Sequence, residues 1–531
     1  MCGIFGVLDH ASAAVPSGDL LRDTARRMRH RGPDGHGIFA EAGIGLVHTR
    51  LAIVDPDERS SQPFRDPTGR YCLVYNGELY DHAELRAELV RQGARFRTTS
   101  DTEVLLEALI RLGVEPALRR LEGMFAFALY DRQEQSLVLA RDRFGIKPLF
   151  VHDGAGAFLF ASSVDAMRPW LALRPDPMTV FAYLDGVDIP TSGRSFYEGV
   201  AIVPPGAVVR VRRGARAGSS QCLTMNDLFD PATAERFARL PRRDLVDHVE
   251  AVLRDSVESQ LRADVPVGAL CSGGIDSSLV MAMAVRSHGD LRIFHADVAG
   301  PLSERSAAER LSRHLKLDLK VVEVRDEHFT TTLPDVVEHY GSPFINPTTV
   351  PVLLVSRLVQ EHGIKAVLTG EASDECFLGY EWLVPNIRRG IRRLPARLLG
   401  LAPGRRARGA PAPVRDRELV AGLPGRFEDE LGPAALPGAP DSAYQAPATA
   451  GLARDGDLSH ILRTLLHRND SLGMAASVES RFPFLDSRVV AAAAHLPPDC
   501  KIRFSPRAFR GRRPFFIDKW IVRQVAARYL P

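Results

Sequence analysis

The periodicity of apolar residues changes partway along this chain of 531 residues. The first part contains short alternating apolar runs bounded by turn residues, which is typical of strands, together with two stretches of helical periodicity. After residue 242, apolar strand segments alternate with helical segments, and this order favours a doubly wound parallel sheet. Between the two parts, residues 204–242 break both patterns with an Arg/Gly/Ser-rich stretch. We therefore predict a two-domain α/β protein, with domains at 2–210 and 242–531 and a linker at 211–241.

The second part carries the more detailed expectations. Strands are predicted at 265–271, 291–298, 319–324 and 365–368, and helices at 245–261, 277–287 and 350–361. Ser306 and Glu309 have the spacing of a capping box at the start of a further helix. Residues 388–447 are rich in Arg, Pro, Gly and Ala, but no aromatic residues are interleaved with the ten arginines between Arg388 and Arg417, so a variable surface insertion is favoured over an RNA-binding patch.

Composition excludes several classes of function. The formal net charge of +3 is small for this length, which argues against a surface built to hold nucleic acid or an anionic membrane and favours small-molecule substrates. No apolar run approaches the roughly 20 residues of a membrane helix, and the first residues lack a signal-peptide pattern, so a cytoplasmic protein is expected. The cysteines are widely scattered, which predicts free thiols: Cys2, Cys72, Cys222, Cys271, Cys376 and Cys500.

Cys2 is the first candidate for chemistry. Removal of Met1 would make it the first residue, and its own α-amine, with a pKa of about 7.7 to 8.0, could then act as the base for its thiol. Taken alone, the position is more typical of a small apolar residue at the start of a strand. The decision therefore depends on the polar motifs that follow.

Five polar motifs follow Cys2, and a strand-rich core would need none of them. They are His30–Asp34, His48–Asp55, Asn76–Tyr80, Ser100–Glu103 and Arg141–Pro148. With these motifs, the region from Cys2 to Val203 closely resembles the class II glutamine amidotransferases. Because that family consists of N-terminal nucleophile hydrolases, the resemblance implies an αββα glutaminase domain.

The resemblance assigns a role to each matching residue. Cys2 would be the nucleophile, the Arg50 guanidinium would clamp the glutamine α-carboxylate and Asp101 would pair with the α-ammonium, which suits their charges. The Asn76 side chain and the Gly77 N–H would form the oxyanion hole. The remaining residues implied to contact glutamine are Leu51, Ala52, Ile53, Val54 and Glu78. Arg31–Asp34 and Arg141–Lys147 are favoured as structural and interdomain segments.

A second motif, Ser272-Gly273-Gly274-Ile275-Asp276-Ser277-Ser278, lies between a predicted strand and a predicted helix. A glycine-rich turn that leads into a helix N-terminus directs backbone N–H groups at an anion. An ordinary strand-to-helix turn is the alternative. The motif resembles the pyrophosphate loop of ATP pyrophosphatases, which implies ATP binding by Ser272, Gly273, Gly274, Asp276 and Ser277.

A third motif, Thr369-Gly370-Glu371-Ala372-Ser373-Asp374-Glu375, follows the strand predicted at 365–368. Ligands of doubly wound sheets bind at the carboxyl ends of strands. Carboxylates beside a triphosphate imply Mg²⁺, because the two groups repel unless a hard cation lies between them. The region Pro347–Tyr380 is similar to the asparagine synthetases.

That similarity implies further roles in the second domain. Thr369 and Gly370 would touch AMP, Glu371 would support formation of an acyl-adenylate, and Asp276 and Asp374 would hold the metal and its pyrophosphate. The residues implied to line the adenine nucleotide are Leu270, Cys271 and Ala296. Lys519 and Arg523 resemble a KxxxR motif whose lysine steadies the adenylate, and on a helix the two side chains would share one face.

The sequence leaves the acceptor open. The resemblance implies a glutamine-hydrolysing asparagine synthase-type ligase that uses glutamine, ATP and, by default, aspartate, and it allows a homodimer. Around Glu371, however, EASDEC replaces a glycine-containing motif, and the chain stops early at Leu530-Pro531, where a C-terminal cap is expected to be missing. A tailoring amidotransferase acting on another carboxylate is the alternative. An RNA-modifying pyrophosphatase and a non-catalytic binding paralogue are the rivals from other classes.

Overall fold

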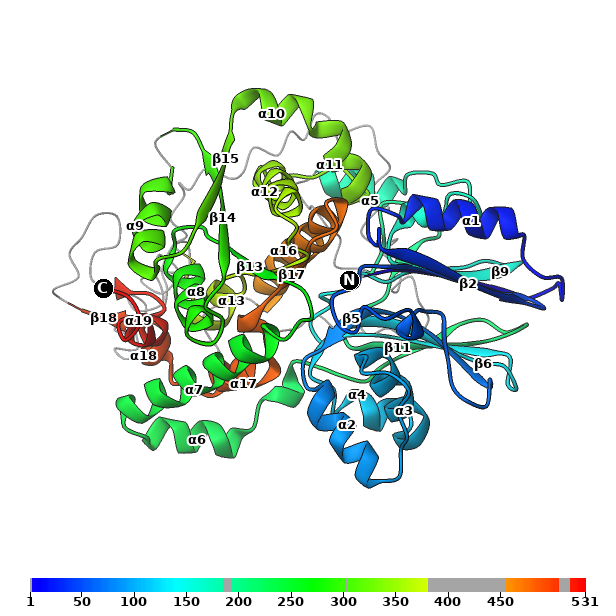
Figure 1. Ribbon diagram of the computed structural model, residues 1–531, viewed down its shortest axis with the longest axis horizontal. Coiled ribbons are helices and arrows are strands. Elements are labelled where there is room, and N and C mark those ends of the chain that lie inside the picture. The colour runs from blue at the N-terminus through cyan, green and yellow to red at the C-terminus, as the bar shows by residue number, and fades with distance from the viewer. Residues whose placement is uncertain (1, 185–192, 301–302, 381–454, 506–515) are drawn as a thin grey trace, which may run out of the picture.

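The computed structural model describes residues 2–184, 193–300, 303–380, 455–505 and 516–531, with the backbone alone for 455–460. The insertion predicted at 388–447 lies outside the described residues. Figure 1 shows two domains side by side, with the start of the first strand at their junction.

The first domain is a sandwich of two six-stranded antiparallel sheets in the described part of the chain. One sheet has the order β10-β8-β9-β1-β3-β2, with bounds Ala201–Ile202, Phe150–Asp153, Ala157–Ala161, Gly3–Asp9, Ile44–Arg50 and Gly35–Glu41. The other has the order β12-β11-β7-β6-β5-β4, with bounds Gly218–Gln221, Ala207–Arg212, Ser136–Arg141, Gly123–Asp131, Tyr71–Leu79 and Phe64–Arg65. The outer faces are covered by α1 (Gly18–Arg27) on one side and by α2 (His82–Arg91), α3 (Asp101–Leu112) and α4 (Val114–Leu118) on the other. The predicted αββα layering is confirmed.

Strands of this sandwich are buried on both faces, which explains their nearly continuous apolar sequences. In β1, Ile4 and Leu8 point between the sheets, whereas Phe5 and Val7 pack under α1. Side chains alternate between the two faces of a strand, so each strand contributes to two core layers at once.

The second domain has a five-stranded parallel sheet in the order β15-β14-β13-β16-β17. Its strands are Leu319–Val324, Arg292–Val298, Val267–Leu270, Ala366–Leu368 and Glu479–Arg481. Its helices include α7 (Arg242–Gln260), α8 (Ile275–Ser287), α9 (Arg305–Leu315), α11 (Leu333–Tyr340), α12 (Thr349–Glu361), α13 (Ser373–Phe377), α16 (Asp455–Ala475), α17 (Ser487–His495) and α19 (Trp520–Ala526). The chain order reverses between β13 and β16, and ligands of doubly wound sheets bind at such a switch point. The predicted parallel sheet is confirmed.

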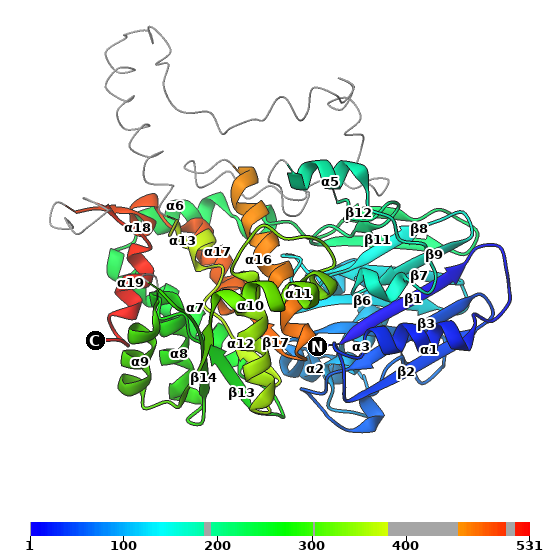
Figure 2. The ribbon, with the colours of Figure 1, turned by 90° about the horizontal axis from the view of Figure 1, so that it is seen from above.

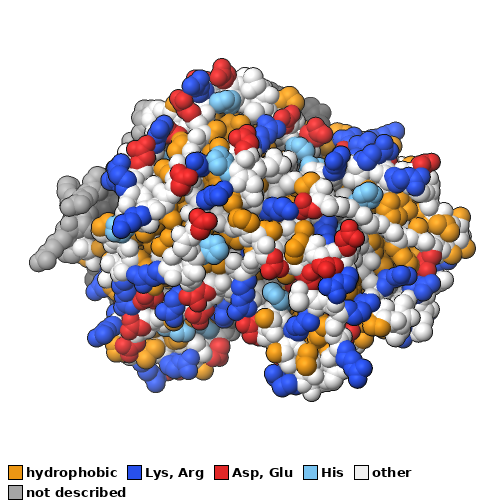
Figure 3. Space-filling view, in the orientation of Figure 1, with side chains coloured by type: hydrophobic (Ala, Val, Ile, Leu, Met, Phe, Trp, Pro, Cys, Tyr) orange, Lys and Arg blue, Asp and Glu red, His pale blue; other side chains and the backbone are white. Residues whose placement is uncertain are grey.

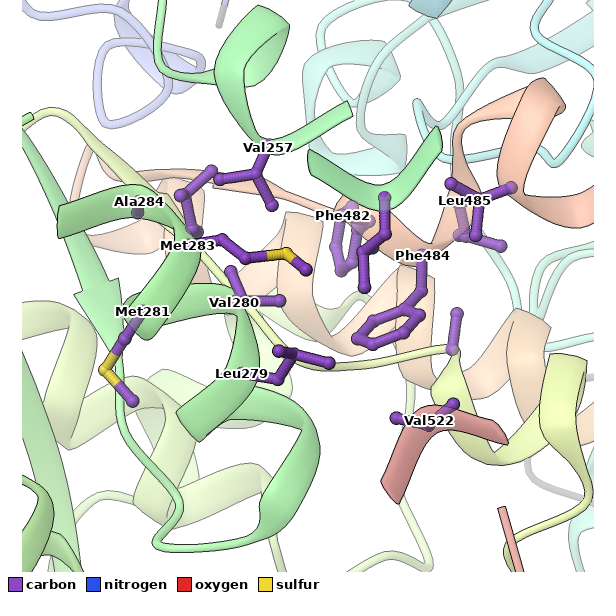
Figure 4. Close-up of a cluster of buried hydrophobic side chains, with 14 of the residues drawn as sticks. Val257, Leu279, Val280, Met281, Met283, Ala284, Phe482, Phe484, Leu485 and Val522 are labelled. Carbon is purple, nitrogen blue, oxygen red and sulfur yellow. The ribbon is translucent and has the colours of Figure 1, made fainter. Parts of the chain in front are cut away.

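One apolar core continues from the second domain into the first. Figure 4 shows Phe482 and Phe484 pointing toward Val257, Leu279 and Met283. The same cluster includes buried side chains of the first domain, among them Leu51, Ile53, Met124, Phe144 and Ile146. The domains are therefore packed together by apolar contact.

Some details differ from the sequence expectations. The predicted boundary at residue 210 falls inside β11, and β12 extends the first domain's sheet to Gln221; the polar, partly exposed edge strand β12 has a weak apolar signal. Ser306 and Glu309 do not form a capping box; α9 begins at Arg305 after Glu304, without a side-chain cap. Within the described residues, no helix is both long and apolar enough to span a membrane. Acidic and basic side chains are interspersed over both domains on the face in Figure 3.

His48 gives the first domain a testable dependence on pH. Its imidazole is buried on β3, and burial, reinforced by the charge of Arg50, lowers its pKa from 6.5 to about 3. Because only the unfolded chain binds the proton between these values, the stabilisation is complete above about pH 6.5 and is lost as the pH falls toward 3. His48→Gln should make this loss shallower in denaturant-unfolding curves measured across that range. The same change at exposed His314 is the control, and equal profiles for the two variants would contradict the assignment.

Candidate active site

The strand pairing of the first domain places Cys2 beside Asn76. Cys2 directly precedes β1, and its backbone N–H donates to Asn76 Oδ1 at 2.9 Å. The thiol is buried, and this burial raises its pKa. Gly3 has to be glycine, since a Cβ there would lie 2.6 Å from Thr49 Oγ1. Cys2 is thus held tightly at the domain junction.

A pocket opens at Cys2 and gathers most of the residues expected to bind glutamine. Its lining consists of Cys2, Arg50, Leu51, Ile53, Val54, Ser60, Gln62, Tyr75, Gly77, Glu78, Ser100, Asp101 and Thr102. Ala52 and Asn76 are not among the lining residues: the Ala52 N–H donates to Asp34 Oδ2 at 2.7 Å instead, and Asn76 lies between the lining residues Tyr75 and Gly77 in β5. Ser60, Gln62 and Tyr75 were not predicted, and for Tyr75 the available signal was its position beside Asn76 in the same strand.

Asn76 presents an unused donor next to the nucleophile position. It is fully buried on β5, and its Nδ2 has no hydrogen-bond partner among the described residues. A buried amide N–H₂ without a partner is costly, so such a group beside a pocket indicates a ligand acceptor. The neighbouring Gly77 allows close packing, because a Cβ there would lie 2.2 Å from the Met124 carbonyl oxygen.

Charged groups of both signs line the pocket. The Arg50 guanidinium is oriented by the carbonyl oxygens of Asp55 and Asp57 and by the Ser60 hydroxyl. Asp101 begins α3 and accepts from the Tyr75 hydroxyl at 2.9 Å and from the Leu79 N–H at 3.1 Å. Burial raises the pKa of Asp101, which a bound cation would oppose. The pocket therefore suits a zwitterion such as an amino acid.

Glu78 lines the pocket as expected and also reaches the second domain. Its Oε2 lies 3.5 Å from Nη2 of Arg481, a residue of the second domain. Sequence reasoning missed this ion pair because the two residues are far apart in the chain.

The predicted phosphate loop has an internal hydrogen-bond network. It connects β13 to α8, and Gly273 adopts a positive φ of 79°. The Ser272 hydroxyl lies 2.9 Å from the Ser277 hydroxyl and accepts from the Gly274 N–H at 3.2 Å. The loop is therefore shaped before any ligand arrives.

Thr369 and Gly370 lie against this loop, as expected for adjacent strands at the switch point. A Cβ on Gly370 would lie 2.4 Å from the Ser277 backbone nitrogen, so only glycine fits. The structure thus brings the second and third motifs together at the carboxyl ends of β13 and β16.

Lys519 lies between the two carboxylates expected to bind metal. Its Nζ is 2.6 Å from Asp276 Oδ2 and 2.9 Å from Asp374 Oδ1. Burial raises the pKa of Asp276, and the Lys519 ammonium opposes that shift. Within the described ranges, no group of three or more His, Cys, Asp or Glu side chains could hold a metal alone. The oxygen donors fit Mg²⁺ that arrives with phosphate ligands, as this ion usually binds.

The expected sharing of one helix face by Lys519 and Arg523 is wrong. Lys519 precedes α19 in a left-handed conformation, with φ of 46°, and Arg523 pairs with Asp518 at 2.9 Å. The backbone reversal turns the lysine away from the helix face that the four-residue spacing implied.

The other residues expected at the nucleotide lie nearby in the fold. Leu270 and Ala296 are half-buried on the α12 side of the sheet. Cys271 differs, because its side chain is buried in the core on the other face of the sheet. Its carbonyl oxygen lies 2.7 Å from His295 Nδ1. Glu371 is held by two neighbours that the sequence analysis missed, Arg468 and Asn469 of α16.

Comparison with known sequences identifies both domains. The glutamine amidotransferase domain profile matches residues 1–221. The asparagine synthase profile matches residues 248–531. The chain belongs to the asparagine synthase family.

Among the relatives of this asparagine synthase family member, some are named asparagine synthetase and others are named amidase. A Mycobacterium tuberculosis protein provisionally named asparagine synthetase [glutamine-hydrolyzing] is 33% identical, covering 97% of this chain and 84% of its own. Asparagine synthetase [glutamine-hydrolyzing] 1 of Bacillus subtilis is 29% identical, with coverage of 95% and 82%. Amidase chyE of Penicillium rubens is 28% identical, with coverage of 100% and 87%.

In this family member, α16 connects the two sites. Figures 1 and 2 show α16 at the domain junction beside the start of β1. Its residues Arg468 and Asn469 bind Glu371, and the next residue, Asp470, accepts from Arg31 Nη2 at 2.8 Å. The Nε of Arg31 donates in turn to the Cys2 carbonyl oxygen at 3.3 Å. One helix therefore contacts a group at each site.

The buried Arg31–Asp470 pair predicts a sharp difference between single and double variants. Arg31→Met leaves the Asp470 carboxylate buried without its partner and should lower the free energy of unfolding by about 3–5 kcal/mol. Arg31→Met/Asp470→Leu should recover most of that loss in denaturant titrations. Arg59→Met, which removes an exposed pair with Asp57, is the control and should cost at most about 1 kcal/mol. Equal losses in the single and double variants would refute the explanation.

Proposed function

We propose that this chain hydrolyses glutamine at Cys2 and uses the ammonia to amidate a carboxylate that it activates with ATP. The observation that carries the glutaminase half is the unpartnered, buried Nδ2 of Asn76 beside Cys2, next to a pocket lined by Cys2, Arg50 and Asp101. A nucleophile, an oxyanion donor and groups for an amino-acid zwitterion are what amide hydrolysis requires.

The proposed glutaminase mechanism uses the new amino terminus. After loss of Met1, the Cys2 α-amine takes the thiol proton, since burial raises the thiol pKa and makes a base necessary. The thiolate attacks the amide carbon, and the Asn76 Nδ2 and the Gly77 N–H stabilise the oxyanion. Collapse of the intermediate releases ammonia and leaves a thioester, which water hydrolyses to glutamate. Arg50 and Asp101 hold the α-carboxylate and the α-ammonium.

The proposed synthetase half acts at the switch point. The loop Ser272–Ser277 and Thr369-Gly370 hold the triphosphate and AMP, with the base between Leu270, Ala296 and the Cys271 backbone. Asp276 and Asp374 would hold Mg²⁺, which neutralises phosphate charge when bound. Lys519 would contact the phosphates, and Glu371 would lie close to the adenylated acceptor.

A cavity between the domains supports transfer of ammonia. It is lined by His30 and Arg31 of the first domain and by Tyr340, His467 and Ser471 of the second. Arg31 contacts the Cys2 carbonyl oxygen, so the cavity begins next to the proposed site of ammonia release.

Aspartate is the default acceptor, and asparagine the default product. The bacterial relatives named asparagine synthetase support this assignment. A tailoring amidotransferase is the second candidate, favoured by the fungal amidase of similar identity and by the altered sequence EASDEC that starts at Glu371. A cytoplasmic location and a homodimer stay predictions of the family resemblance.

Substitutions at the first site test the glutaminase. Cys2→Ala should abolish glutamine hydrolysis but leave amide synthesis from ammonium chloride. Asn76→Ala should lower kcat for glutamine hydrolysis by about 10²–10³-fold, as for loss of an oxyanion donor. Glutamate release is the measurement, and Cys222→Ala, which changes a buried cysteine outside the pocket, is the control. Full activity of Cys2→Ala would rule the mechanism out.

An acceptor screen tests the synthetase. AMP and pyrophosphate release should require ATP, a carboxylic acid and Mg²⁺, and excess EDTA should stop it. Aspartate-dependent release with asparagine as product supports the default assignment. Release that depends on a different acid, with aspartate inert, would establish the tailoring activity instead.

A further inference from the structure

Arg481 is a buried arginine that touches both active sites. It ends β17, the strand next to β16, and its side chain is fully buried. Its guanidinium donates through Nε to Glu479 at 2.7 Å and through Nη1 to the carbonyl oxygens of Gln260 and Arg262 at 2.7 and 2.9 Å. These bonds fix the guanidinium and leave Nη2 directed at the first domain.

On the glutaminase side, Nη2 lies 3.5 Å from Glu78, which lines the pocket of Cys2. This separation is longer than a normal hydrogen bond, so the contact can shorten or be exchanged for a ligand contact. Glu479 and Glu78 compete for one guanidinium. The pKa of Glu479 falls to about 2 because the charged amino terminus and then the Arg481 guanidinium outweigh its burial, whereas burial and the charge of Glu479 raise the pKa of Glu78. Glu78 is thus the more weakly held carboxylate.

A second series of hydrogen bonds runs from the Arg481 guanidinium to residues 51–55, the loop expected to bind glutamine. The carbonyl oxygens of Gln260 and Arg262 belong to the segment between α7 and β13. Two residues later, Asp264 donates its N–H to the Ile53 carbonyl oxygen at 3.0 Å and accepts from the Asp55 N–H at 2.8 Å. The Asp55 carbonyl oxygen in turn orients Arg50.

On the synthetase side, the backbone of Arg481 positions Thr369. The Arg481 carbonyl oxygen accepts both from the Thr369 N–H at 2.9 Å and from its hydroxyl at 3.2 Å. The next residue, Gly370, lies against Ser277 of the phosphate loop. Movement of β17 would therefore move the nucleotide site.

We propose that Arg481 is a positioning residue that couples glutamine hydrolysis to the ATP-dependent half-reaction. Glutamine bound at Glu78 changes how Glu78 shares the guanidinium, and MgATP bound at Thr369 and Gly370 fixes β17, so each ligand favours the arrangement that suits the other. This inference rests on the proposed function of the two sites.

The test is Arg481→Lys, which keeps the charge and the carbonyl contact with Thr369 but cannot span four partners. Three rates are compared in the full chain: glutamate release with and without MgATP and acceptor, amide synthesis from glutamine, and amide synthesis from ammonium chloride. L-Aspartate, or the acid selected by the acceptor screen, is the acceptor. We expect amide formed per glutamate released to fall about fivefold or more. Synthesis from ammonium chloride should stay near wild type.

Arg242→Lys is the matched control, because it changes another paired arginine, held by Asp499 at 2.9 Å, that is part of neither series of hydrogen bonds and lies outside the pocket. It should keep the wild-type ratio. Glu78→Gln, tested alone and with Arg481→Lys, should lower the same ratio, and the two effects should be non-additive. An unchanged ratio in Arg481→Lys, or equal losses in glutamine- and ammonia-driven synthesis, would overturn the coupling role. A wild-type chain without glutamate release or AMP release would instead refute the proposed function.

Discussion

Burial of one apolar core across the domain junction fixes the relation between the two sites. Phe482 and Phe484 pack in the same cluster as Met124, Phe144 and Ile146 of the first domain. Apolar burial contributes roughly 25 cal/mol per Å², so separating the domains would expose costly surface. The Cys2 pocket and the nucleotide loop are consequently held in one arrangement, so the proposed passage of ammonia between them would need no domain movement.

Polar contacts inside this apolar junction give it specificity. Arg31–Asp470 and Arg481–Glu479 are buried ion pairs, and burying such pairs costs desolvation energy that their attraction only partly offsets. These ion pairs contribute to orientation, since each guanidinium also donates hydrogen bonds to backbone carbonyl oxygens at fixed positions. An apolar junction alone would allow the packed elements to shift past one another, whereas these ion pairs fix which residues near β1 and in β17 meet which partners.

The two sites differ in how far they are prepared for ligands. In the first domain, Asn76 and Asp101 are already held by strand β5 and helix α3. In the second, Lys519 pairs with Asp276 and Asp374, the positions proposed for the metal. A metal ion at these proposed positions would displace the ammonium, because like charges repel. The proposal therefore includes a rearrangement of one side chain at the second site and none at the first.

The sequence by itself determined the two layered α/β domains and the position of each motif. Alternating apolar residues and glycine-rich turns are local signals, so the strands and the loop Ser272–Ser277 could be predicted from them, whereas Cys2, Arg50, Asn76 and Asp101 were predicted from motifs that resemble the class II glutamine amidotransferases. The sequence did not locate the end of the first domain, where β11 and β12 pass the expected boundary at 210.

Only the tertiary structure decided the partners of the charged residues. The contacts of Glu78 with Arg481, of Glu371 with Arg468, and of Lys519 with Asp276 join positions far apart in the chain. Neither periodicity nor spacing encodes such contacts, because they depend on how whole domains pack. For Lys519, one left-handed residue before α19 was enough to change the direction that helical spacing predicted.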